Sequence, residues 1–103
     1  MRIALGIEYD GSQFAGWQLQ KDDSVRTVQG CVEPALSKIA DQPIQVVCAG
    51  RTDTGVHALN QVVHFDFEQS RDPKAWVLGL NTYLPDDVSA IWVRDVSEDF
   101  SAR

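Results

Sequence analysis

Apolar and polar positions alternate at the start of the chain. Ile3, Leu5, Ile7 and Tyr9 stand between small or charged residues, a period-two pattern that predicts a strand with one buried face. Apolar runs predict three further strands over residues 44–49, 62–67 and 88–96. We expect the third strand to pair with the second, across a long connection between them.

Helical spacing replaces this alternation in two segments. In the first, Thr27 is the expected N-cap, and the apolar positions are Val28, Cys31, Val32, Ala35, Leu36, Ile39 and Ala40. Pro34 predicts a kink or a later start, because proline removes one helical hydrogen bond. In the second, Asp72 and Pro73 predict the start and Pro85 the stop. Its apolar stripe is Trp76, Val77, Leu80, Tyr83 and Leu84.

The predicted order is β-α-β-β-α-β, the split βαβ arrangement of ferredoxin-like and RRM-like domains. The fold class is therefore α+β, with a four-stranded antiparallel sheet and two helices on one face. At 103 residues the chain is expected to be a single domain, residues 1–103. Trp92 and Val62 fall on the other face, which needs a cover or a ligand.

Composition narrows the functional classes. A net charge of −6 argues against a free-standing nucleic-acid binder, unless a local cluster or a second domain supplies positive charge. Cys31 and Cys48 have no metal-ligand spacing, and we expect both to be reduced core thiols. No apolar run is long enough for a membrane span, and no signal peptide is recognisable, so a cytoplasmic protein without a membrane partner is expected.

Candidate chemistry is densest in residues 49–58, between the second and third predicted strands. Two glycines bracket Arg51, Thr52, Asp53 and His57 there. A positioned, ionised carboxylate at Asp53 could act as a nucleophile at a sugar carbon or as a general base. The alternative is a surface hairpin in which Arg51 and Asp53 form a weak exposed ion pair.

A second loop, residues 13–23, carries two aromatic residues beside glycines. Phe14 and Trp17 could form a stacking surface for a base. Equally, they could fold back over the edge of the core.

Several separated motifs together resemble the tRNA pseudouridine synthase A family. They are Glu8-Tyr9-Asp10-Gly11-Ser12, Phe14, Gly16-Trp17-Gln18, Gln20, Thr27-Val28-Gln29, Gly50-Arg51-Thr52-Asp53 and Gly55-Val56-His57-Ala58. The resemblance continues to Phe100-Ser101-Ala102-Arg103 and covers essentially the whole chain. Thr54 stands where many members have Ala or Ser.

The resemblance implies an isomerase that converts uridine to pseudouridine in the anticodon stem-loop of tRNA. Asp53 would be the catalytic carboxylate, acting on the sugar as nucleophile or base, with no metal and no organic cofactor. Arg51 and Thr52 would contact substrate or RNA, Arg51 filling the gap left by a flipped base or pairing with Asp53. Phe14, Trp17 and Gln18 are further RNA-contact candidates. Since the family chemistry needs no histidine, His57 and His64 are expected to be structural.

The resemblance also implies that the chain is the N-terminal domain of a two-domain enzyme that forms a homodimer with tRNA across both subunits. The second half would carry an active-site tyrosine, a basic residue and much of the positive surface, so the fragment alone is expected to be inactive. The alternative function is a non-catalytic RRM-like RNA-binding or dimerisation module. Tyr9, Phe65 and Phe67 argue against an RRM, because they fall on the faces predicted to meet the core.

Overall fold

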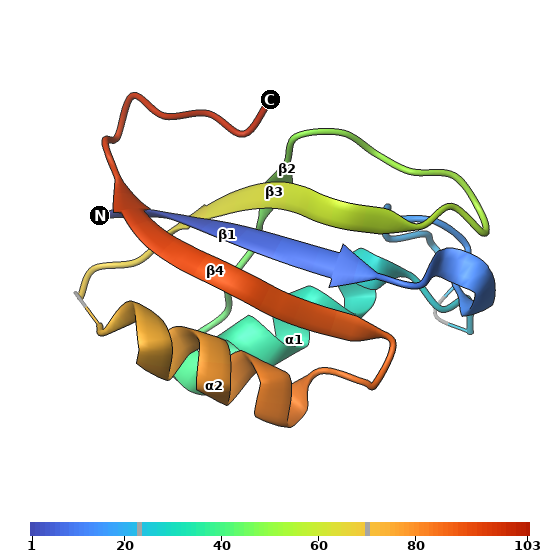
Figure 1. The fold of residues 1–103 in the computed structure, drawn as a ribbon, viewed down its shortest axis with the longest axis horizontal. Helices are drawn as coiled ribbons and strands as arrows, with labels where there is room; N and C mark the ends of the chain where they lie inside the picture. The colour runs from blue at the N-terminus through green and yellow to red at the C-terminus, as the bar shows by residue number, and fades with distance from the viewer. Residues whose placement is uncertain (23, 70) are drawn as a thin grey trace.

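The computed structural model describes residues 1–22, 24–69 and 71–103. The predicted order of elements is confirmed, with a short 3-10 turn added after the first strand (Figure 1). The elements are β1 (Arg2–Tyr9), η1 (Gly11–Gln13), α1 (Val28–Ala40), β2 (Val47–Cys48), β3 (Ala58–Asp66), α2 (Pro73–Tyr83) and β4 (Val88–Val96). None of the described helices is both long and apolar enough to cross a membrane.

The four strands form one antiparallel sheet in the order β2-β3-β1-β4, in which β1 pairs along its whole length with β3 on one side and β4 on the other. The alternating residues of β1 join α1 and α2 in one apolar core, which confirms the α+β fold with helices on one face. Tyr9, Phe65 and Phe67 are buried in this core, as expected. Phe65 and Phe67 pack edge-on against Trp76 of α2.

The second strand is shorter than predicted, because the backbone before it bonds to helix side chains. Val46 N donates to Glu33 Oε2 at 2.9 Å, and Ile44 N donates to Ser37 Oγ at 2.9 Å. Both apolar side chains are still buried. The apolar run over residues 44–49 therefore reflects burial, but only Val47 and Cys48 pair with β3.

The third strand is longer than predicted and begins at Ala58, inside the predicted loop. It pairs with β1 from Asp66 opposite Arg2 to Ala58 opposite Tyr9. The polar residues Asn60 and Gln61 hid this extension, since they interrupt the apolar alternation.

The helix boundaries agree closely with the prediction. Thr27 Oγ1 accepts from Gly30 N at 3.1 Å as the N-cap of α1, and Asp72 caps α2 with Pro73 in its first turn. α1 begins at Val28 and runs unbroken through Pro34, so a later start is excluded. Tyr83 is not a core residue: its side chain is 52% exposed, and Lys38 Nζ lies 5.1 Å from the ring centre.

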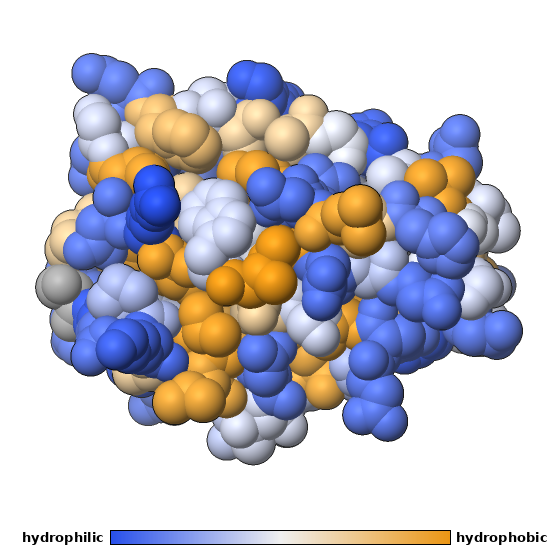
Figure 2. Space-filling model, in the orientation of Figure 1, coloured by the Kyte–Doolittle hydropathy of each residue, from blue (hydrophilic) through white to orange (hydrophobic). Residues whose placement is uncertain are grey.

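Trp92 covers part of the sheet face that the helices leave open. Its indole occupies the space that a side chain at Gly6 would need, and its Nε1 donates to Asn60 Oδ1 at 3.1 Å. Trp92 and Val62 are half-buried, as expected for this face. Toward α2, apolar side chains line a groove that includes Val77, Leu78 and Ile91 (Figure 2).

Both cysteines lie where the sequence placed them, Cys31 on α1 and Cys48 on β2. Their thiols are free, as expected. Both are only half-buried at the border of the core, so full burial is wrong.

Candidate functional site

The Asp53 loop (residues 49–57) connects β2 to β3 and lies at the same end of the sheet as residues 10–17 (Figure 1). Residues 10–17 follow β1, and the Asp53 loop leads into β3. The sheet, in which these two strands are neighbours, therefore brings the two candidate loops together. The polar backbone groups of both loops then bond to each other.

Thr52 connects the Asp53 loop to β1 and to the loop that carries Phe14 and Trp17, the aromatic loop. Its Oγ1 lies 2.8 Å from the hydroxyl of Tyr9, and its carbonyl accepts from Trp17 N at 3.1 Å. Gly16 has a φ of +91°, and a Cβ there would lie 2.5 Å from the Thr52 carbonyl oxygen. Glycine at position 16 thus permits both the left-handed turn and the close approach of the two loops.

The far side of the Asp53 loop is fixed in the same way. Gly55 N donates to Phe14 O at 3.2 Å, and Val56 N donates to Asp53 O at 3.1 Å. The Val56 carbonyl occupies the space beside Gly11, where a Cβ would lie 1.9 Å from its oxygen. Asp53 is therefore held between two anchored stretches of backbone.

His57 is a hydrogen-bonding residue, as expected. Its Nδ1 accepts from Gly11 N at 2.9 Å, which requires an unprotonated Nδ1. Asp10 Oδ1 lies 3.1 Å from the same Nδ1. Hydrogen bonds from the Ser12 hydroxyl and amide hold the pKa of Asp10 below its usual range.

Asp53 itself is exposed, at the start of the turn that Val56 N closes by donating to Asp53 O. Among the residues that the structure describes, no ion pair joins it to Arg51. The ion pair that the hairpin alternative requires is therefore not formed. An exposed carboxylate on a fixed backbone is accessible to a substrate without first breaking an internal ion pair.

Two of the three aromatic-loop candidates are buried. Phe14 and Trp17 are each 2% exposed, and both belong to the core. The Arg26 guanidinium covers one side of the Phe14 ring at 4.1 Å, and Tyr9 packs against the ring edge-on. Packing over the core edge thus explains both aromatics, and Gln18 is the exposed member of the three.

Sequence reasoning missed the polar contacts that support this site. Gln61 is 7% exposed, its Nε2 donates to Gly50 O, and the same nitrogen lies 3.5 Å from the Tyr9 hydroxyl. The only local signal was that Gln61, just before the predicted strand, is in phase with the core-facing Val63 and Phe65, and a glutamine buried there needs a hydrogen-bond partner. Its partners could not be read, because they lie 11 and 52 residues away.

The two sides of the Asp53 loop differ in charge. A hollow of about 430 Å³ on one side is lined by residues that include Glu8, Asp10, Asp86 and Asp87, a negative environment that disfavours a phosphate. Arg51 lies on the other side, in a smaller hollow with Cys48 and Arg103. Within the described ranges, no three His, Cys, Asp or Glu side chains gather as metal ligands.

Comparison with known proteins identifies the family. A family model described as tRNA pseudouridine synthase matches residues 6–103. The chain is 62% identical to tRNA pseudouridine synthase A of Colwellia psychrerythraea and 60% identical to that of Methylococcus capsulatus, in each case over 100% of this chain. It covers 39% and 37% of those two relatives, so it spans less than two fifths of their length. With a matching family model over nearly all of its residues, the chain belongs to the tRNA pseudouridine synthase family.

Proposed function

We propose that this chain supplies the catalytic aspartate, Asp53, of an enzyme that isomerises uridine to pseudouridine in the anticodon stem-loop of tRNA. The supporting observation is the exposed carboxylate of Asp53 on a loop anchored at Thr52 and Val56. Membership of the tRNA pseudouridine synthase family supports the choice of this reaction for the exposed carboxylate.

The reaction rearranges bonds within one nucleotide. The N1–C1′ glycosidic bond breaks, the uracil turns, and C5 bonds to C1′ while the C5 hydrogen leaves as a proton and N1 gains one. Asp53 would act on the sugar, either by attacking C1′ or by removing a sugar proton. A base must leave its stack before either step, so the loop has to meet a flipped nucleotide.

The other predicted residues have supporting roles in this proposal. Arg51 contacts the RNA or fills the gap left by the flipped base, and Gln18 contacts RNA from the neighbouring loop. Thr52 fixes the backbone of Asp53 through its bond to Tyr9. Phe14 and Trp17 act from the core, by holding the loop that Asp53 packs against.

Replacing Asp53 by asparagine tests the proposal. In the complete enzyme, Asp53→Asn is expected to abolish pseudouridine formation, because the amide is neither a nucleophile nor a base. Tritium release from tRNA labelled at uridine C5 measures turnover. Asp41→Asn is the matched control: it makes the same change at an exposed residue with φ of 56°, a conformation that asparagine tolerates.

The control variant is expected to retain full turnover and the same unfolding midpoint. Turnover by Asp53→Asn comparable with that of Asp41→Asn would disprove the catalytic assignment.

We further propose that the complete enzyme contains a second domain, forms a homodimer and works in the cytoplasm. The greater length of the relatives supports the second domain. Sedimentation of the complete enzyme tests the homodimer, since a monomer at micromolar concentration would contradict it.

A further inference from the structure

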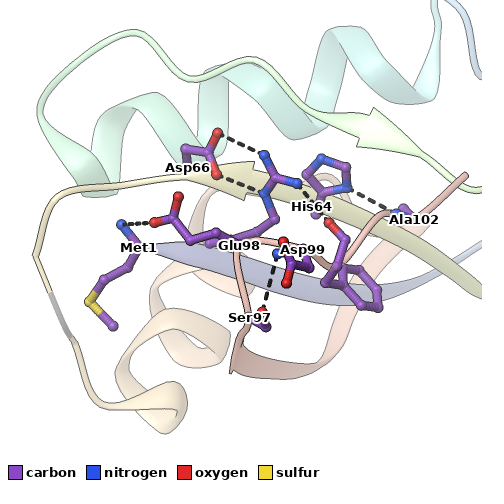
Figure 3. A network of polar contacts seen from close by, with 9 residues as sticks. Met1, His64, Asp66, Ser97, Glu98, Asp99 and Ala102 are labelled. Carbon is purple, nitrogen blue, oxygen red and sulfur yellow. Dashed lines mark hydrogen bonds and ion pairs between the residues drawn. The ribbon is translucent and has the colours of Figure 1, made fainter.

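The C-terminal strap (residues 97–103) returns across the open face of the sheet and is held there by polar contacts (Figure 3). Arg2 anchors its middle: Nη1 donates to Phe100 O at 2.7 Å, while the Nε and Nη2 of the same guanidinium bond to Asp66. At its start, Glu98 lies 3.6 Å from the N-terminal ammonium. The path of the strap is thus set by strands β1 and β3.

His64 holds the last turn of the strap. It lies on the open face of β3, is 6% exposed, and its Nδ1 accepts from Ala102 N at 3.0 Å. The Phe100 ring packs edge-on against the imidazole, with ring centres 6.1 Å apart. A buried histidine that the proposed chemistry does not use therefore fixes the backbone immediately before Arg103.

The result is that Arg103 lies beside Arg51. The two residues line one hollow of about 270 Å³ together with Cys48, Ala49 and Gly50, and no Asp or Glu side chain is among its lining residues. Burial raises the pKa of the Cys48 thiol, and the charges of Arg51 and Arg103 oppose that rise.

Neither arginine is neutralised in the described part of the chain. Arg2 and Arg26 form ion pairs with Asp66 and Asp87, but no ion pair involves Arg51 or Arg103. In a chain with a net charge of −6, two unpaired arginines that line one hollow are a local reversal of charge. Guanidinium groups bind phosphate through paired hydrogen bonds, so the chemistry of this hollow suits a phosphate.

We propose that Arg51 and Arg103 together bind a backbone phosphate of the RNA beside the Asp53 loop, and that His64 is the positioning residue that holds Arg103 there. The inference rests on the proposed function, because it requires RNA to lie at this end of the sheet. The acidic hollow on the other side of the loop would repel the backbone, so the two hollows also orient the strand.

RNA affinity and its salt dependence test the site. Fluorescence anisotropy of a labelled anticodon stem-loop is measured with the complete enzyme carrying Asp53→Asn, which keeps the substrate intact. Adding Arg103→Gln is expected to weaken binding roughly tenfold to hundredfold, as for loss of a charged hydrogen bond. The slope of log K against log [salt] is expected to fall in magnitude by about 0.7 to 0.9, as for loss of one phosphate contact.

Arg94→Gln is the matched control, since it removes the same charge from another exposed arginine, on β4. It is expected to leave the affinity within about twofold and the slope unchanged. Equal weakening by both substitutions, or no change with Arg103→Gln, would overturn the inference. Either result leaves the turnover test of Asp53 unaffected.

His64→Ala tests the positioning role. It keeps both arginines but removes the acceptor for Ala102 N, and is expected to produce most of the Arg103→Gln effect, whereas His64→Gln restores an acceptor and part of the affinity. Wild-type affinity in His64→Ala would remove His64 from the proposal.

Inorganic phosphate, added at constant ionic strength, distinguishes a site for free phosphate from one for the RNA backbone. Displacement of RNA by phosphate supports a shared anion site. Binding of phosphate, with no effect of Arg103→Gln on RNA affinity, overturns the proposal.

Discussion

At the scale of single residues, His64 links the stability of the strap to pH. Burial lowers its pKa below the ordinary 6.5; the charges of Arg2 and Arg103 act in the same direction, and Asp66 partly opposes them. Neutral imidazole is also what the structure needs, since Nδ1 accepts from Ala102 N. Folding therefore keeps a proton off a group that the unfolded chain would protonate more readily.

This difference predicts the direction of a pH effect. Because the unfolded chain binds more protons below the ordinary histidine pKa, the free energy of unfolding is expected to fall as the pH drops through about 6.5. His64→Gln keeps an acceptor but does not titrate, so the free energy of unfolding of this variant should fall less between about pH 7 and about pH 5. Urea unfolding of both proteins across this range measures the difference. Identical losses in the two proteins would contradict the assignment.

The single residues also show what the sequence could reveal about the site. Asp53 and Arg51 were found because local motifs carry them in a loop with two glycines. The hydrogen bonds of Tyr9, Gln61 and His64 were not predicted, because a side-chain hydrogen bond between segments far apart in the sequence leaves no local pattern. Phe14 and Trp17 show the converse, since an aromatic residue suits a base or a core equally and only its burial decides.

At the scale of elements, side chains of α1 replace part of the sheet. Glu33 Oε2 accepts from Val46 N at 2.9 Å and from Gln29 Nε2 at 3.1 Å. Through these bonds the helix holds the segment that leads into β2 and then into the Asp53 loop. A change in α1 can therefore reach the site through backbone.

Removing this carboxylate is expected to loosen the segment. Glu33→Ala leaves the Val46 amide without its partner and is expected to lower the free energy of unfolding by about 1 to 2 kcal/mol, with a smaller loss for Glu33→Gln, which keeps an acceptor. Urea unfolding gives the energy, and faster hydrogen exchange at the Val46 amide locates it. Glu68→Ala, at an exposed residue, is the control. Equal effects at positions 33 and 68 would refute this role of α1.

Elements whose apolar pattern matches their hydrogen bonding were predicted well. β4 has the predicted bounds, and both helices begin at the predicted caps. β2 and β3 differ because burial and strand pairing separate there: Ile44 and Val46 are buried without strand bonds, while Asn60 and Gln61 are in a strand despite polar side chains. Periodicity reports burial, and it reports pairing only indirectly.

At the scale of the whole molecule, one apolar cluster joins elements from both ends of the chain. It runs from Ile3 on β1 to Val93 on β4 and includes both helices. The radius of gyration, 12.7 Å, is close to the value of about 13 Å for a folded chain of this length. From these features we expect an independently folding unit.

We expect the 103-residue chain to fold alone but not to catalyse. Its unfolding in urea should be a single transition, with coincident curves from tryptophan fluorescence and far-UV circular dichroism. Tritium release from labelled tRNA should stay at background, because the remaining length of the relatives is expected to supply other parts of the active site. Separate transitions would contradict a single core, and turnover by the isolated chain would contradict the shared active site.

The placement of Trp92 over Gly6 makes the open face optically distinguishable from the rest of the protein. The chain has three tryptophans, and Trp17 and Trp76 are buried at 2% and 0% exposure, whereas Trp92 is half-buried beside Asn60. A water-soluble quencher therefore selects one indole of three. Ligands that settle across this face can be followed by the native emission of Trp92, without a dye and without a substitution.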